Sequence, residues 1–192
     1  MHDIEPFFQW RDAYIAAEDP RSPMYGHDND EFYFTNAIYN YYIHPQWDEF
    51  GSSTLYMKIL YVDYDLHYAI IELIGEWNDC IYNDIMTLRR EITDLMQNEG
   101  INRFMLVCEN VLNYHAGDDN AYYEEWFEEI ADGSGWVAII NPLDHVADEM
   151  FKYGLNQYVH LLTDSPWRGH KPRALLKWAE EHIFSQKLLR VG

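Results

Sequence analysis

From residue 53 onward, short continuous runs of hydrophobic residues alternate with stretches in which hydrophobic residues have helical spacing. The runs at 54–62 and 68–74 are rich in β-branched and aromatic residues, and the polar break between them has the length of a hairpin turn. They predict two antiparallel strands. Three further apolar runs, which also predict strands, lie at 104–108, 136–140 and 158–162.

Helical spacing is clearest between residues 78 and 100. Asn78 or Asp79 can cap the start of this predicted helix, and Gly100 fits the left-handed position after its end. Apolar residues recur at alternating steps of four and three, which predicts that they face the core together. This apolar stripe consists of Ile81, Ile85, Leu88, Ile92 and Leu95.

Three more helices are predicted between and after the later strands. The first is capped by Asp118, Asp119 or Asn120, and its inward residues are Tyr123, Trp126, Phe127 and Ile130. The second covers 143–153, with Val146 and Met150 inward and Phe151 as a further candidate. The last starts at Pro172, and its inward residues are Leu175, Leu176, Ala179 and Ile183.

The predicted order of elements is therefore ββαβαβαβα. Continuously apolar strands separated by helices are typical of a mostly parallel sheet with covering helices and right-handed crossovers. We predict an α/β fold that begins with a β-hairpin. A length of 192 residues suits one domain. Within it, 1–52 form an N-terminal arm packed on an α/β core at 53–163, and 164–192 carry a C-terminal helix.

The N-terminal arm has no regular period apart from a predicted short helix near 4–17. It contains four prolines and a cluster of aromatic residues. Because exposing many rings to water is costly, we expect the arm to lay them on the core. The cluster consists of Phe32, Tyr33, Phe34, Tyr39, Tyr41, Tyr42, Trp47 and Phe50.

The net charge of the chain limits the kinds of molecule that it can bind. Thirteen Lys and Arg against thirty-three Asp and Glu leave a net charge of −20. This charge argues against nucleic acid and against anionic membranes, which bind clustered cations. The segment 165–192 is the exception, with two acids and six bases. We expect this basic tail to dock on the acidic body; the alternative is a contact with an acidic partner.

The two cysteines, Cys80 and Cys108, show no metal-binding or disulfide spacing, and both lie in apolar patterns. They are predicted to be buried free thiols, which fits a reducing compartment. The start of the chain has no leader pattern, and no apolar run approaches the roughly 20 residues of a membrane span. We therefore expect a cytoplasmic protein without membrane insertion.

Catalytic and cofactor motifs are missing from the sequence. It has no phosphate-binding GxxxxGK[ST] or GxGxxG, no GxSxG and no HExxH. No cofactor and no metal are predicted. His115, Asp118 and Asp119 form the one compact group of potential metal ligands at the carboxyl end of a strand. We interpret Asp118 and Asp119 as helix caps, because a helix start needs these residue types at that place in any case.

Acidic residues line the outer side of the predicted helix that follows Asn120. They form a solvated face, or else a docking surface for a basic partner or for this chain's own Lys171, Arg173 and Lys177. Acid/base catalysis near 76–79 is an alternative that needs two close carboxylates with a raised pKa. The residues proposed to contact a partner or ligand are Trp77, Asp79, His115, Asp118, Asp119, Glu124 and Glu128.

The element order, with ELIGEWND at 72–79, RFMLVC at 103–108 and WVAIINP at 136–142, resembles the STAS-like domains of sulfate transporters and anti-sigma-factor antagonists. The resemblance covers about 55–163, with Gly75 and Glu76 at the Gly-acid turn that precedes a long helix. Antagonist-type domains carry a phosphorylated serine in a later turn, whereas NYHAGDDN at 113–120 has no serine or threonine. The resemblance implies a non-catalytic domain that binds a protein or a small apolar ligand.

We therefore predict a cytoplasmic, non-catalytic binding protein that acts through homo-oligomerisation and a regulatory or scaffold contact with another protein. The first alternative is a small-molecule or lipid-binding module with a pocket between the aromatic arm and the sheet. The second is a metal-assisted hydrolase that uses His115, Asp118 and Asp119. A closed aromatic pocket at the junction of arm and core would favour the first alternative, and a bound divalent ion would favour the second. A flat apolar or acidic surface with neither would favour the partner-binding prediction.

Overall fold

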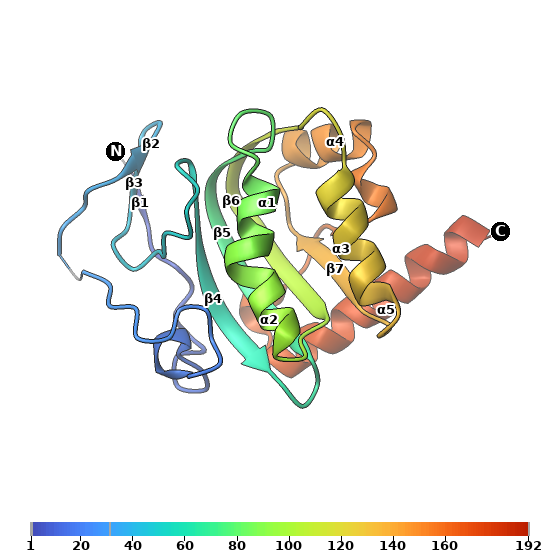
Figure 1. Cartoon of the computed structure of the whole chain (residues 1–192), viewed down its shortest axis with the longest axis horizontal. Coiled ribbons are helices and arrows are strands. Elements are labelled where there is room, and N and C mark those ends of the chain that lie inside the picture. Colours follow the sequence, from blue (N-terminus) through green and yellow to red (C-terminus); the bar gives the residue numbers. More distant parts are fainter. Residues whose placement is uncertain (1, 31, 192) are drawn as a thin grey trace.

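A five-stranded sheet forms the centre of the computed structural model, which describes residues 2–30 and 32–191 (Figure 1). The first two strands are an antiparallel hairpin and the other neighbours pair in parallel. The predicted α/β fold with a hairpin start is confirmed. In spatial order the strands are β4 (Leu55–Asp63), β5 (Tyr68–Asn78), β6 (Arg103–His115), β7 (Trp136–Ile140) and β8 (His160–Leu162).

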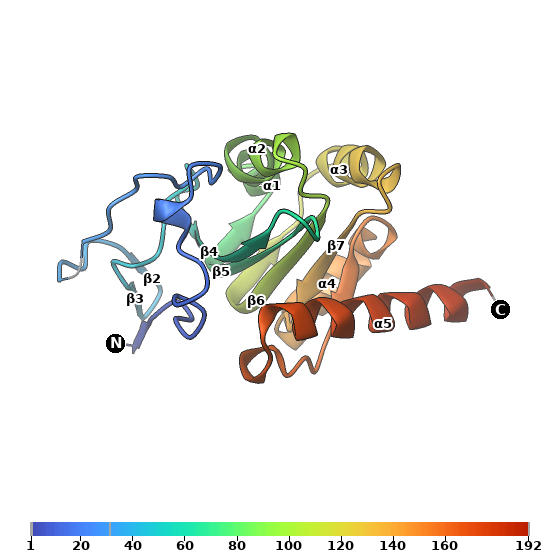
Figure 2. The same ribbon diagram turned by 90° about the horizontal axis from the view of Figure 1, so that it is seen from below.

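Helices cover both faces of this sheet (Figure 2). One face carries α1 (Asp84–Leu88), a π-helical turn η2 (Arg89–Thr93), α2 (Asp94–Asn98) and α3 (Ala121–Ala131). The opposite face carries α5 (Pro172–Val191). Helix α4 (Asp144–Lys152) and the 3-10 turn η3 (Leu155–Gln157) lie between β7 and β8 in the chain, and the 3-10 turn η4 (Trp167–Gly169) follows β8.

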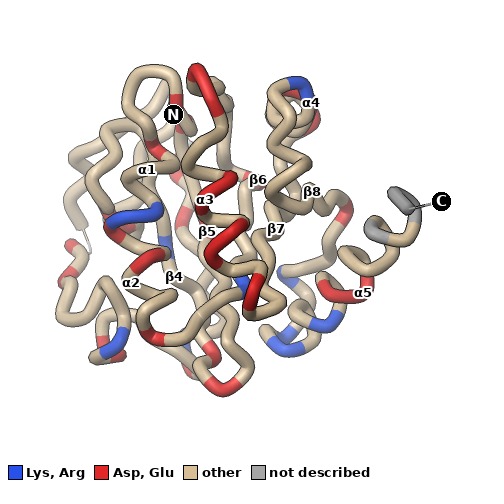
Figure 3. Tube along the Cα trace, turned by 45° about the vertical axis from the view of Figure 1, so that its right-hand side comes forward, with Lys and Arg blue, Asp and Glu red and all other residues tan. Residues whose placement is uncertain are grey.

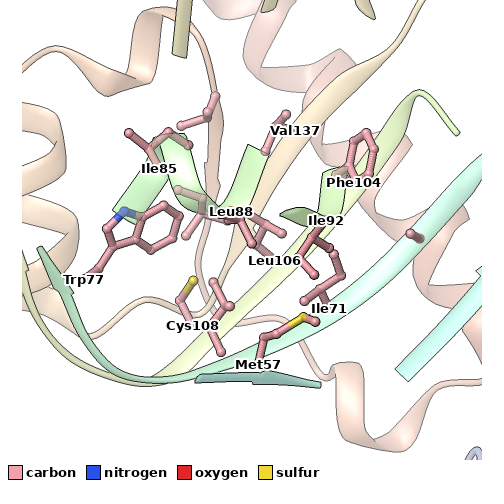
Figure 4. Packing of buried hydrophobic residues seen from close by; sticks show 14 of the residues in the cluster. Met57, Ile71, Trp77, Ile85, Leu88, Ile92, Phe104, Leu106, Cys108 and Val137 are labelled. Carbon is pink, nitrogen blue, oxygen red and sulfur yellow. The ribbon is translucent and has the colours of Figure 1, made fainter. Parts of the chain in front are cut away.

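The larger core cluster lies between the sheet and α1 to α3 (Figure 4). Leu88 and Ile92 pack there among strand residues such as Phe104, Leu106 and Val137. A second cluster joins the other face of the sheet to α5, and it contains all four inward residues predicted for the last helix. The apolar faces of the strands therefore pack against the apolar faces of the helices in these two clusters.

The long helix differs from its predicted course at both ends. Asn78 still belongs to β5 and the helix begins at Asp84, so Ile81 lies in the preceding turn and is 72% exposed. At the other end Leu95 is 46% exposed and Met96 is buried. The π-helical turn η2 is the reason, because one extra residue turns a helix by about 100° and moves the next apolar position inward. Gly100 adopts the expected positive φ of 91°.

Three other predictions of burial or length are wrong. Phe127 and Phe151 are 40% and 64% exposed, so the inner faces of α3 and α4 are narrower than predicted. Cys80 is exposed, because the turn that carries it lies outside the helix, whereas Cys108 is buried. Strand β6 runs on to His115, seven residues beyond the predicted end, by pairing with the long β5.

The N-terminal arm forms a small sheet of β1 (His2–Ile4), β3 (Tyr41–Ile43) and β2 (Ala37–Ile38), in that order. The predicted helix at 4–17 is absent among the described residues, which contain only the 3-10 turn η1 (Ala16–Glu18) there. The reason is tertiary: the Phe7 amide donates to Glu72 Oε2 across 2.8 Å, and its ring packs against Trp167.

The aromatic cluster of the arm divides into buried and exposed rings. Trp47 and Phe50 are buried as predicted, but Phe32, Tyr33 and Tyr39 are between 60% and 77% exposed. Only one side of the small sheet packs on the core, where Ile38, Ile43 and Trp47 meet Tyr56 and Ile74. The expectation that the cluster as a whole covers the core is wrong, because Phe32, Tyr33 and Tyr39 lie in segments outside the three strands of the small sheet and are exposed.

Candidate functional site

Asp79 lies buried just beyond the end of β5, where it accepts four hydrogen bonds from the protein. Its Oδ1 accepts from Trp77 Nε1 at 3.0 Å and from the Ile85 amide at 2.8 Å. Its Oδ2 accepts from Tyr123 OH at 2.7 Å and from Tyr114 OH at 3.3 Å. One carboxylate thus joins β5, β6, α1 and α3 at the carboxyl edge of the sheet.

Burial raises the pKa of Asp79 to about 6, while the hydrogen bonds from Tyr123, Ile85 and Trp77 act in the opposite direction. A second acid supports the same turn, because Asp84 Oδ2 accepts a hydrogen bond from the backbone N–H of Asn78 at 2.7 Å. Since protein donors saturate Asp79, its geometry suits an anchor for the β5–α1 turn and leaves little capacity for acid/base work.

The anchored turn carries exposed apolar groups. Ile81 is 72% exposed and Tyr82 is 47% exposed, and Cys80 precedes them. A cavity of about 610 Å³ beside this turn is lined by Asp79, Cys80, Ile81, Arg90, Gly117, Asp118, Asp119, Tyr122, Glu125 and their neighbours. We call the exposed residues Cys80, Ile81, Tyr82, Asp118, Asp119 and Glu125 the carboxyl-edge surface.

Asp118 and Asp119 belong to this surface, but His115 does not join them in a metal site. His115 Nε2 contacts Glu76 Oε1 on the neighbouring strand. Asp119 Oδ1 accepts the Ala121 amide at 3.0 Å at the start of α3, which is the capping role considered from the sequence. Among residues 2–30 and 32–191, no group of three or more His, Cys, Asp or Glu is arranged to hold a metal ion. The hydrolase hypothesis therefore has no support from this geometry.

The acidic face of α3 is partly neutralised from within the chain. Glu125 Oε2 lies 3.0 Å from Arg89 Nη1, and Glu129 Oε2 lies 2.6 Å from Arg89 Nη2. Arg89 comes from the π-helical turn, whereas Lys171, Arg173 and Lys177 belong to α5 or the residue before it, on the opposite side of the sheet (Figure 2). The hypothesis that the tail docks on this face is wrong. Glu124 and Glu128 remain on its exposed side.

A second buried carboxylate, Glu72, lies on the α5 face of β5 and was missed as a functional residue. It accepts the Phe7 amide at 2.8 Å and Asn110 Nδ2 at 3.4 Å, and Arg168 Nη2 lies 3.6 Å away. Burial raises the pKa of Glu72 to about 7. Arg168 also reaches Glu109 at 3.0 Å, so the basic tail does dock on the acidic body.

The sequence carries a signal for Glu72 but none for the contact between Tyr114 and Asp79. Glu72 is the single acid in the apolar run 68–74, and an acid in a buried strand needs partners. The predicted strand ends at 108, which places Tyr114 in a loop. Its contact with Asp79 follows only from the extended pairing of β5 and β6.

No family model matches the chain, and no curated protein matches it either. Among solved structures, the crystal structure of a Thermotoga maritima protein described as an anti-sigma factor antagonist is similar at 19% identity and a TM-score of 0.41. The match covers 57% of this chain and 86% of the other. The strand order itself establishes the α/β fold.

Proposed function

We propose that this chain is a non-catalytic binding protein that engages a partner protein through the carboxyl-edge surface. The observation that carries the proposal is Ile81, a large apolar side chain that is 72% exposed on a turn anchored by the buried Asp79. Exposed apolar groups on a fixed backbone lose little conformational freedom on binding, which favours a contact role.

Charge defines the chemistry of the proposed partner. Asp118, Asp119 and Glu125 flank Ile81 at the cavity, and Figure 3 shows further acidic residues along α3. Arg90 is the cation at this rim. A partner segment with a large apolar side chain beside Lys or Arg would complement this surface in both shape and charge.

The residues singled out from the sequence divide by role in this proposal. Asp118, Asp119, Glu124 and Glu128 would contact the partner or steer it by charge. Trp77 and Asp79 are buried and would position the turn. His115 lies beside Glu76 in a neighbouring cavity that shares Cys80 and Ile81 with this surface.

Selection from a random displayed-peptide library tests the proposed surface. Peptides retained by the wild-type protein should contain a large apolar residue next to Lys or Arg, and Ile81→Asp should reduce their binding by about tenfold or more. Phe151→Asp is the matched control, since Phe151 is similarly exposed on α4. Failure to enrich such peptides, or equal binding by Ile81→Asp, would contradict the proposal.

We also propose that the protein self-associates through the projecting end of α5, which extends past the sheet in Figures 1 and 2. Phe184 and Leu188 are 65% and 60% exposed there and lie one helical turn apart. Two copies related by a twofold axis would bury these side chains against each other. Cytoplasmic location remains part of the proposal; no helix in the described residues has the length and apolar character to cross a membrane.

Sedimentation equilibrium tests the self-association. The wild-type chain should sediment as a concentration-dependent dimer. The double variant Phe184→Glu, Leu188→Glu should sediment as a monomer, because each copy would bring two negative charges to the contact. Phe151→Glu should behave as the wild type. A wild-type protein that stays monomeric at about 100 μM, about −5.5 kcal/mol on the affinity scale, would refute this contact.

A further inference from the structure

A second cavity of about 390 Å³ lies where the N-terminal arm meets β4. Its lining combines apolar and polar side chains. The apolar ones are Phe7, Trp10, Tyr14, Ile15, Met24, Ile59 and Leu60, and the charged ones include Arg11, Glu18 and Asp28 as well as Asp48 and Lys58. A cavity of this size that joins aromatic rings to converging polar groups suits a small molecule. The cavity is separate from the carboxyl-edge surface, so ligand binding here is independent of the proposed partner contact.

The polar part of the lining is centred on Asp48, whose side chain is 2% exposed. Its Oδ1 accepts from Lys58 Nζ at 3.0 Å and from Asn29 Nδ2 at 2.9 Å. His27 Nε2 lies 3.9 Å from the same oxygen. Asp48 Oδ2 is buried and has no hydrogen-bond partner among residues 2–30 and 32–191.

An unpartnered carboxylate oxygen in a buried position is costly, and a donor from an occupant of the cavity would remove that cost. The carboxylate torsion is soft, so a partial turn of the group can bring this oxygen toward the cavity that Asp48 lines. Lys58 Nζ uses two of its three donors on Asp48 and Asn29. This part of the cavity therefore offers one acceptor and one donor.

We infer that this cavity binds an uncharged small molecule with an aromatic ring and a hydroxyl or primary amide group. Such a group donates to Asp48 and accepts from Lys58, while the ring packs on Trp10 and Phe7. Asp48 and Lys58 already neutralise each other. An anion would face the field of a chain with net charge −20, and an ammonium group would place a second cation beside Lys58.

Three probes of nearly equal shape test this inference: phenylacetamide, phenylacetate and phenethylamine. In protein labelled with ¹⁵N at tryptophan, phenylacetamide should shift the Trp10 indole resonance in a saturable way, with Trp10→Phe used to assign it. Affinity for the two charged probes should be about tenfold lower or weaker still. Asp48→Asn should weaken phenylacetamide binding by a similar factor, because it removes the acceptor.

A second variant covers the case in which Asp48→Asn fails to fold. Ala17 is half-buried and lines the cavity, so Ala17→Phe should fill it and abolish the Trp10 shift while leaving the ion pair intact. Ala147→Phe, at a half-buried position on α4 outside the cavity, should bind as the wild type does. No saturable shift, equal affinity for the three probes, or undiminished binding by Ala17→Phe would overturn the inference.

Discussion

Leu88→Ala should lower the free energy of unfolding by about 2–5 kcal/mol. Leu88 is fully buried in the core cluster between α1 and the sheet, where it lies near Ile85, Ile92 and Leu106 (Figure 4). Removing its side chain loses apolar burial and leaves a cavity that a close-packed core cannot collapse to fill. Urea unfolding followed by circular dichroism measures the loss.

Leu95→Ala is the matched control for that substitution. Both leucines belong to the same apolar stripe in the sequence, but Leu95 is 46% exposed in the structure. Its replacement should cost less than about 0.5 kcal/mol, the usual range for surface positions. Equal losses at the two positions would mean that the helix runs without the π-helical turn and that Leu95 faces the core.

The second large effect is a pH dependence centred on Glu72. Burial raises the pKa of Glu72 to about 7 in the folded chain, from its ordinary value of 4.5. Between these two values the folded state holds a proton that the unfolded state has released, so this group makes stability fall as pH rises. At 1.36 kcal/mol for each unit of pKa, this group makes the free energy of unfolding about 3 kcal/mol lower above pH 8 than at pH 4.

Glu72→Gln should remove this dependence. The amide oxygen can still accept from the Phe7 amide, and no charge has to be buried. We expect the variant to gain up to about 3 kcal/mol over the wild type at pH 8 and nothing at pH 4. Unfolding free energies measured from pH 4 to 8 give the difference curve, with the exposed Glu99→Gln as control. A variant less stable than the wild type at pH 8 would show that Arg168 outweighs the cost of burial.

How much of this could be predicted from the sequence depends on the range of the interactions. The strand at 68–74 and the apolar faces of the helices were predicted because hydrophobic periodicity is a local property of the chain. Leu88 and Ile92 follow from that periodicity. Gly100 was predicted because a left-handed residue after a helix is also a local requirement.

Positions that depend on residues distant in the sequence were predicted less well. Asp79 was expected to cap a helix or contact a partner, but its burial requires Tyr114 and Tyr123, 35 and 44 residues away. The helix expected at 4–17 gives way to contacts with Glu72 and Trp167. Tertiary contacts of this kind outweigh the small local propensities on which sequence interpretation relies.

The sequence by itself determined the order of strands and helices after residue 53, most of the apolar faces that must be buried and the acidic character of the chain. Only the tertiary structure decided which polar groups are enclosed: Asp79 at the carboxyl edge, Glu72 beneath the arm and Asp48 in the cavity. Enclosure depends on how the arm, the sheet and α5 pack together, because burial of a carboxylate is tolerated only where several distant donors meet it. The spacing of residues within one segment cannot specify which distant donors will surround a buried carboxylate.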